Sequence, residues 1–264
     1  MFMKLFSALI LLSSLSFAYQ DSDIDGVEDS IDKCPNSSFD EVVDEDGCSP
    51  NQHYLGVLTL LVGSDVNIDK YSQTTTNFNF FANYRYSNWD ITLSNANNTA
   101  STSSNSLSSD YGDLYLSTGY YLENTSLTAK LDVGTKLATA DEDTGTGEND
   151  LFASLYLNRS ITQRQNLYLY YRYTISGDSH YVDYRDFSTY SIGSGYALSP
   201  NWYSALSYDY SASPYSHTQP YKAISWFNSH AFSKHLFATI NYAHGLNDLS
   251  PAHTVSLKLG VRFE

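Results

Sequence analysis

Five acidic residues near the N-terminus have a spacing that suits a divalent cation. They occupy the first, third, fifth, ninth and twelfth places of a twelve-residue segment, as Asp21, Asp23, Asp25, Asp29 and Asp32. Calcium takes six to eight oxygen ligands, and the glycine at Gly26 gives the sharp turn that lets one short loop supply several of them. Carboxylates this close together repel one another unless a cation neutralises them. The segment therefore predicts a calcium site, and a solvated acidic linker without metal is the alternative.

The same segment resembles a known repeat. DSDIDGVEDSIDKCPNSSFDEVVDEDGC, residues 21–48, resembles a thrombospondin type 3 repeat, in the version found beside outer-membrane barrels. The matching residues cover about a tenth of the chain: Asp21, Asp23, Asp25, Gly26, Asp29, Asp32, Cys34, Pro35, Asp44, Asp46, Gly47 and Cys48. The resemblance implies that the Asp side chains and the carbonyl of Val27 bind calcium. One departure from helix–loop–helix calcium sites is Asp32, which stands where a bidentate Glu is usual.

Residues 1–18, MFMKLFSALILLSSLSFA, have the pattern of a secretory signal peptide. Lys4 precedes an apolar stretch, and Ser16 and Ala18 are small residues at the cleavage positions. A buried N-terminal helix is the alternative. We expect the mature chain to begin at Tyr19 in an oxidising compartment, where Cys34 and Cys48 can form a disulfide. A two-thiol metal site is less favoured, because no His or further Cys lies nearby in the sequence.

Charge and composition exclude several classes of protein. The 14 Lys and Arg against 29 Asp and Glu argue against nucleic-acid binding, which needs a basic face. Residues 21–48 hold eleven of these acids and one Lys, so this segment alone carries −10 of the formal charge of −15. A disordered chain is poor in aromatic residues, whereas 15% of this chain is aromatic. The mean hydropathy is −0.34, and no run after the N-terminus approaches the ~20 apolar residues of a membrane-spanning helix.

From residue 53 onward, side chains alternate with a period of two. In residues 77–86, for example, Phe78, Phe80 and Tyr84 lie on one face, and Asn79 and Asn83 on the other. Short turns near residues 87–88, 123–124, 160–163, 199–201 and 233–234 alternate with longer polar loops at 67–76, 95–110, 139–149, 176–186, 211–220 and 246–252. This division predicts about twelve strands of roughly ten residues, the length of a tilted membrane-spanning strand.

We therefore predict an all-β fold, a transmembrane antiparallel up-and-down β-barrel over residues 51–264. It would follow a signal peptide (1–18) and a calcium-binding segment (19–50), and it would lie in the outer membrane of a Gram-negative bacterium, in contact with lipid. An even number of strands places both termini in the periplasm. A soluble secreted barrel or sandwich is the alternative. The end of the chain, Val261 to Glu264, resembles the aromatic C-terminal signal of outer-membrane barrels, which implies recognition by the barrel-assembly machinery, although a Glu follows Phe263.

Charged residues on the predicted polar face indicate what the barrel could do. We expect Asp132 and seven cations to line the pore: Arg85, Lys130, Lys136, Arg172, Lys222, Lys258 and Arg262. Only Asp90 and Asp209 join Asp132 as acids there, so the wall is predicted to be net basic. Inward charges set ion preference, so a narrow channel with a modest preference for small anionic solutes follows. A polar core filled by its own side chains, without conduction, is equally compatible.

An enzyme and a structural or adhesive protein are two further classes of function. Outer-membrane phospholipases use a barrel of this size with a catalytic Ser and His, but no such motif surrounds any of the seven His, so we expect no enzyme. A structural or adhesive protein would present its polar loops, and the loops at 95–109 and 139–149 suit this role. The whole chain resembles small, uncharacterised barrels of this arrangement, and that resemblance supplies no role.

Overall fold

The structure is a computed structural model that describes residues 21, 23, 25–34, 37, 42–49, 56–96, 112–123, 126–140, 148–177 and 184–263. The predicted signal peptide lies outside the described residues. The chain forms two compact units, Met1–Leu55 and Gly56–Glu264, which are considered separately below. None of the described helical segments is long and apolar enough to span a membrane.

Gly56–Glu264 is built from twelve strands. Their bounds are β1 (Val57–Ile68), β2 (Thr74–Tyr86), β3 (Trp89–Ala96), β4 (Asp113–Glu123), β5 (Leu127–Leu137), β6 (Asp150–Ser160), β7 (Gln165–Ile175), β8 (Phe187–Ser199), β9 (Trp202–Ser211), β10 (Tyr221–Ala231), β11 (Leu236–Gly245) and β12 (His253–Phe263). Most are ten to thirteen residues long, as predicted from the alternating pattern.

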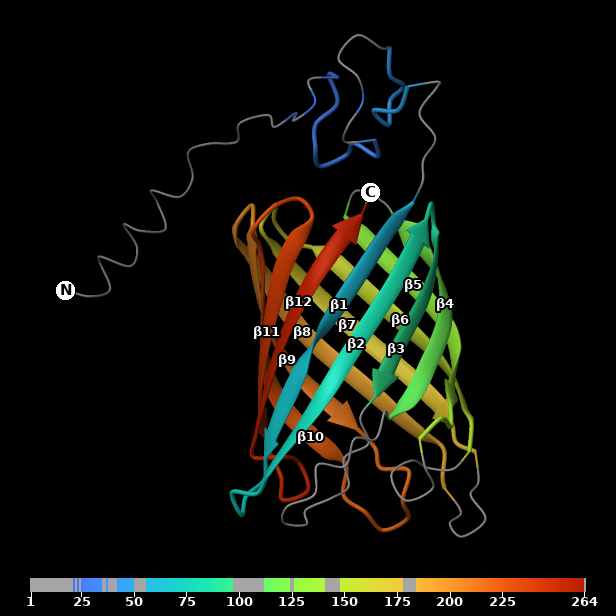
Figure 1. The fold of residues 1–264 in the computed structure, drawn as a ribbon, viewed down its shortest axis with the longest axis vertical. Helices are drawn as coiled ribbons and strands as arrows, with labels where there is room; N and C mark the ends of the chain where they lie inside the picture. Colours follow the sequence, from blue (N-terminus) through green and yellow to red (C-terminus); the bar gives the residue numbers. More distant parts are fainter. Residues whose placement is uncertain are drawn as a thin grey trace, which may run out of the picture. The chain divides into compact units, whose positions relative to one another are not determined.

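The strands close into a barrel (Figure 1). Each strand pairs antiparallel with its neighbours in sequence, and β12 completes the circle by pairing with β1, from Leu58 opposite Phe263 to Ile68 opposite His253. Each of the twelve strands thus has a paired strand on both sides, which meets the condition for placing a sheet in lipid. The prediction of an antiparallel up-and-down barrel of about twelve strands is confirmed.

The connections at one end of the barrel are short. They span residues 87–88, 124–126, 161–164, 200–201 and 232–235, and this end also holds the start of β1 and the end of β12. The long loop predicted at 67–76 is wrong, since residues 69–73 alone join β1 to β2. The Asp69 carboxylate accepts bonds from the N–H groups of Tyr71 and Gln73, both at 2.8 Å, which closes a tight turn. The β-branched residues Thr74–Thr76 extend β2 instead.

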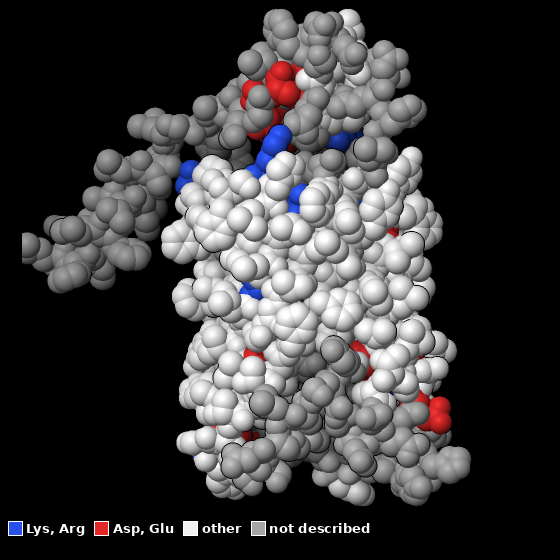
Figure 2. All heavy atoms as spheres, viewed as in Figure 1, with Lys and Arg blue, Asp and Glu red and all other residues white. Residues whose placement is uncertain are grey.

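The two faces of the barrel wall differ sharply in polarity. Large apolar side chains point outward and are exposed, including Ile91 (57%), Leu131 (55%) and Leu206 (58%). Figure 2 shows one side of the barrel, where few charged atoms interrupt the uncharged surface over the strands. The buried residues, by contrast, are mainly polar, such as Asp90, Lys136 and Ser154. A soluble barrel shows the opposite distribution, so the structure favours the membrane-spanning interpretation.

Several inward aromatic rings reach a glycine on the neighbouring strand. A Cβ at Gly193 would fall 2.5 Å from the Tyr168 ring and 2.5 Å from the carbonyl oxygen of Leu206. Gly134 similarly receives the Phe152 ring on the paired strand. A ring that rests on the backbone of a neighbouring strand does not extend toward the barrel axis. The glycines therefore leave room for large side chains along the wall.

Replacing Gly193 by Val tests this arrangement. The new side chain would overlap both the Tyr168 ring and the backbone of β9, so we expect a destabilisation of about 1–3 kcal/mol. The outward Ile192→Val variant, at the neighbouring exposed position, is the matched control and should lose less than about 1 kcal/mol. Urea unfolding from lipid vesicles, followed by tryptophan fluorescence, measures both. Equal midpoints for the two variants would contradict the packing described.

Candidate functional site

Most of the predicted pore-lining residues do point inward. The alternation and register place Arg85, Lys130, Asp132, Lys136, Arg172, Lys258 and Arg262 on the inner face. Lys222 is the exception, because it pairs with Tyr210 and shares the outward face with Ile224 and Trp226. The inward position beside it belongs to Ala223, which is fully buried. The prediction that Lys222 lines the pore is therefore wrong.

The inner face is close to electrically neutral. Against six inward cations, the described strands place seven inward carboxylates: Asp65, Asp90, Asp113, Glu123, Asp132, Asp150 and Asp209. The predicted net basic wall is therefore wrong for the described strands. Asp113 and Asp150 stand at the first positions of β4 and β6, where alternation read from the middle of a strand gives no signal. Their inward position follows only from the register.

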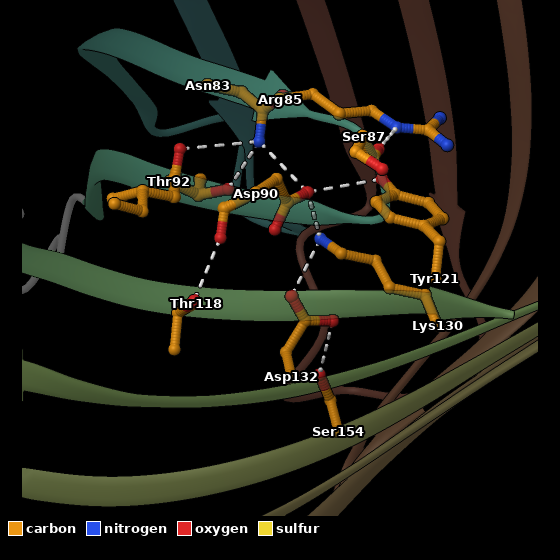
Figure 3. A network of polar contacts seen from close by, with 11 residues as sticks. Asn83, Arg85, Ser87, Asp90, Thr92, Thr118, Tyr121, Lys130, Asp132 and Ser154 are labelled. Carbon is orange, nitrogen blue, oxygen red and sulfur yellow. Dashed lines mark hydrogen bonds and ion pairs between the residues drawn. The ribbon is translucent and has the colours of Figure 1, made fainter. Parts of the chain in front are cut away.

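A network of polar contacts joins β2, β3, β4 and β5 on the inner wall (Figure 3). The Lys130 Nζ lies 2.7 Å from an oxygen of Asp90 and 2.7 Å from one of Asp132. The Asp90 carboxylate also accepts bonds from the Tyr121 hydroxyl at 3.2 Å and from the Asn83 amide at 3.1 Å. A Cβ at Gly119 would fall within 2.6 Å of all three charged side chains, so glycine is needed where they cross β4. One lysine thus holds two carboxylates against the wall.

A second lysine is withdrawn from the lumen. The Lys136 Nζ lies 2.8 Å from Asp150 and 3.8 Å from Asp113, and only 2% of the Lys136 side chain is exposed. Asp113 is fully buried as well. Lys136 therefore points inward, as predicted, but it is covered by its ion pairs and does not present its charge to a solute. Lys136 therefore links β4, β5 and β6 through its two ion pairs.

Arg172 on β7 has a different environment. Its guanidinium carbon stacks 4.3 Å from the centroid of the Phe152 ring, with Tyr115 and Tyr170 each at 5.8 Å. Its Nε is buried and has no hydrogen-bond partner among the described residues. A cavity of about 270 Å³ lies in the wall beside it, with a lining that includes Phe81, Tyr121, Lys130, Asp132, Tyr170 and Arg172. Among the described residues, Arg172 is thus a cation without a carboxylate partner that lies between aromatic surfaces.

The acidic segment is compact around its aspartates. One oxygen each of Asp21, Asp23 and Asp25 lie within 4.8 Å of one another. Asp21 accepts bonds from the N–H groups of Asp25 and Gly26, at 3.2 and 3.0 Å, and Asp25 accepts one from the N–H of Val27 at 2.9 Å. These bonds curl the loop around the carboxylates, as expected for a short loop that supplies several oxygen ligands.

Three carboxylate oxygens of this segment are left without a donor. Asp23 Oδ1, Asp25 Oδ2 and Asp32 Oδ2 are buried and have no hydrogen-bond partner among the described residues. Burial raises the pKa of Asp32, the N–H of Cys34 opposes the rise, and the charges of Asp25, Asp23 and Asp29 add to it. Buried acceptors without donors are costly unless something compensates them. The donor set of hard, clustered oxygens fits calcium.

Cys34 and Cys48 form the expected disulfide, with their Cα atoms 5.1 Å apart. It closes the segment behind the aspartates, where the N–H of Cys34 donates to Asp32 at 2.7 Å and the N–H of Lys33 donates to the carbonyl of Asp46 at 2.8 Å. The two halves of the acidic segment are thus tied together by covalent and backbone contacts.

Comparison with known proteins identifies the fold. No protein family matches the chain, and no curated protein matches it either. Among solved structures, the KdgM porin is similar with a TM-score of 0.54 at 9% identity, over 78% of this chain and 98% of the porin. An outer-membrane channel from Pseudomonas putida F1 has a TM-score of 0.52 at 8% identity, over 79% of this chain and 95% of the channel. The chain therefore has the fold of twelve-stranded outer-membrane channels.

The Lys130→Met variant tests the network of Figure 3. Removing the ammonium leaves the carboxylates of Asp90 and Asp132, with 0% and 11% side-chain exposure, without their cation. Breaking a buried ion pair from one side costs about 3–5 kcal/mol, so the urea midpoint should fall strongly. Lys70→Met is the matched control, because its pair with Asp248 is exposed and screened by solvent, so its loss should leave the midpoint almost unchanged. A double variant, D90N/K130M, should recover part of the loss. Similar losses for K130M and K70M would contradict a buried network.

Proposed function

We propose that this protein is an outer-membrane channel for small polar solutes. The observation that carries this proposal is the polarity of the wall, which is apolar outside and polar inside. The outward side chains suit lipid, whereas ion pairs and hydroxyl groups on the inside suit water. The rings of Tyr168 and Phe152, which rest on glycines of neighbouring strands, support an open lumen rather than a filled core. A twelve-stranded barrel is also wider than the eight-stranded barrels that side chains just fill.

The similar solved structures support the same class of function. They include a porin whose structure was also solved in complex with disordered oligogalacturonate, and a bacterial outer-membrane channel. Their likeness lies in the fold, so it supports a channel and leaves the solute to be inferred from the residues of this chain.

A modest preference for small anionic solutes is a finer part of the proposal. The inner wall is nearly neutral, but its charges are unequally available. Arg172, Lys258 and Arg262 make no ion pair with any described residue, whereas Lys130 and Lys136 are each held by two carboxylates. The carboxylates of Asp65 and Asp209 are capped by serine hydroxyls. Three cations and two carboxylates of the described inner face are thus left outside ion pairs, which favours anions weakly.

The placement in the cell follows from the same features. We infer that the short connections, the start of β1 and the end of β12 face the periplasm, since short turns lie on that side of outer-membrane barrels. The C-terminal strand, ending at Phe263, would then be the element recognised by the barrel-assembly machinery. A signal peptide over residues 1–18 would direct the chain across the inner membrane.

We further propose that the periplasmic segment binds calcium through a thrombospondin type 3-like loop. Asp21, Asp23, Asp25, Asp29 and Asp32, with the carbonyl of Val27, are the proposed ligands. The unpartnered oxygens of Asp23, Asp25 and Asp32 support this proposal, because a bound cation would compensate their burial. Calcium would order the segment and cancel much of its charge.

Planar-bilayer recording tests the channel. The purified protein should produce discrete current steps in KCl, and a salt gradient should give a reversal potential of the sign expected for weak anion preference. Lys258→Glu should shift that potential toward cations, because it replaces an inward cation by an acid. Arg159→Gln, on the outward face of β6, should leave it unchanged. An absence of steps would instead favour a structural or adhesive protein with a filled core.

Calorimetric titration of the full chain with calcium tests the acidic segment. We expect heat of binding that disappears in the D23N/D25N variant, since that variant removes two of the clustered carboxylates. Asp248→Asn, which removes an exposed loop carboxylate, is the control and should titrate like the natural sequence. If the natural chain gives no heat, the calcium proposal fails and the segment is an acidic linker.

A further inference from the structure

The cavity beside Arg172 indicates which class of solute the protein binds. This inference rests on the proposed channel function. We propose that this cavity binds a small zwitterion, such as an α-amino acid, with the solute carboxylate on Arg172 and its ammonium group on Asp132. The cavity, its two charged ends and its aromatic walls each contribute one part of this assignment.

The positive end is the guanidinium of Arg172. Phe152, whose ring centroid lies 4.3 Å from the guanidinium carbon, holds the plane of the group, and Nε lacks a hydrogen-bond partner. A planar guanidinium that lines a cavity is suited to bidentate binding of a carboxylate. None of the described carboxylates forms an ion pair with Arg172, although Asp132 lines the same cavity. The guanidinium is thus available for a carboxylate from outside the chain.

The negative end is the group formed by Asp90, Lys130 and Asp132. Two carboxylates share one ammonium, so the three side chains carry a net charge of −1. Asp90 is buried, and Asp132 is the carboxylate that remains partly accessible, with 11% side-chain exposure. The second oxygen of Asp132 accepts only a long bond of 3.4 Å from the Ser154 hydroxyl. It can accept a further hydrogen bond from an ammonium group.

The two ends together match a zwitterion better than a simple ion. Because Arg172 carries +1 and the three-residue group −1, a solute anion would be attracted by one end and repelled by the other. A zwitterion satisfies both ends and enters without net charge. Asp132, Ser154 and Arg172 are consecutive partners across β5, β6 and β7, so the two ends lie two strands apart, which corresponds to about 10 Å between their Cα atoms.

The volume of the cavity and the side chains that line it restrict the class of solute further. The cavity of about 270 Å³ is just smaller than the pockets of roughly 300–1,000 Å³ that hold drug-sized molecules. A single amino acid is on that scale. Phe81, Tyr121 and Tyr170 supply aromatic surface for an apolar side chain. L-Phenylalanine, with one carboxylate, one ammonium group and one ring, is therefore a suitable probe.

Equilibrium binding to the full-length protein in detergent tests the assignment. L-Phenylalanine is compared with 3-phenylpropionate, which lacks the ammonium group, and with 2-phenylethylamine, which lacks the carboxylate. We expect each of the two analogues to bind about tenfold or more weakly than L-phenylalanine, since each leaves one charged end of the cavity unpaired. Equal binding of 3-phenylpropionate and L-phenylalanine would overturn the zwitterion assignment.

Variants locate the site. Arg172→Gln should weaken L-phenylalanine binding about tenfold or more, and Arg159→Gln, the same change on the outward face of the neighbouring strand, should not alter it. If R172Q does not fold, Arg172→Lys keeps the charge without the planar fork and should still weaken binding. The proposal would be overturned if the natural chain did not bind L-phenylalanine, or if R172Q and R159Q bound it equally well. Current steps measured on the same protein test the channel function separately, because the binding assay gives its result whether or not ions pass through the barrel.

Discussion

The closed ring of backbone hydrogen bonds is the constraint on which the rest of this structure depends. A strand in lipid finds no partner for its N–H and C=O groups except another strand, so the sheet has to return on itself. Here the pairing of β1 with β12 completes the circle over Leu58–Ile68. Once it is closed, every strand has one face toward lipid and one toward the lumen. The alternation of side chains then decides, residue by residue, what each side of the membrane-spanning wall presents.

That division accounts for the reversed burial of the molecule. Buried charges such as Asp90 and Lys136 lie inside the wall, and each is compensated by its own ion-pair partners at 2.7–3.8 Å. Aromatic side chains on the same face are accommodated at glycines of the neighbouring strands. Arg172 differs from these braced groups, because it combines an aromatic support with an unused donor. The difference between paired and unpaired charge, rather than the net charge of the wall, singles out the place where a solute would be recognised.

Much of the fold can be predicted from the sequence, because the period of two and the sorting of short and long connections are local signals. The strand count and the inward positions of Arg85, Lys130 and Arg172 follow from them. Features set at strand ends do not. Thr74–Thr76 extend β2 where a loop was predicted, and Lys222, the second residue of β10, lies on the outward face. The partners of each charge depend on the register across strands. The pairing of Lys130 with two carboxylates and the near-neutral inner wall therefore cannot be predicted from the sequence.

The central claim is a water-filled lumen inside a lipid-facing shell, and cysteine accessibility along β12 tests it most directly. The two native cysteines are joined in a disulfide, so single introduced thiols report alone. In proteoliposomes, a water-soluble maleimide should label cysteines at the inward positions of Thr254, Lys258 and Arg262. It should not label them at the outward positions of Val255, Leu257 and Leu259. Labelling at the outward positions would contradict the lipid-facing shell, and absence of labelling at the inward ones would contradict the aqueous lumen.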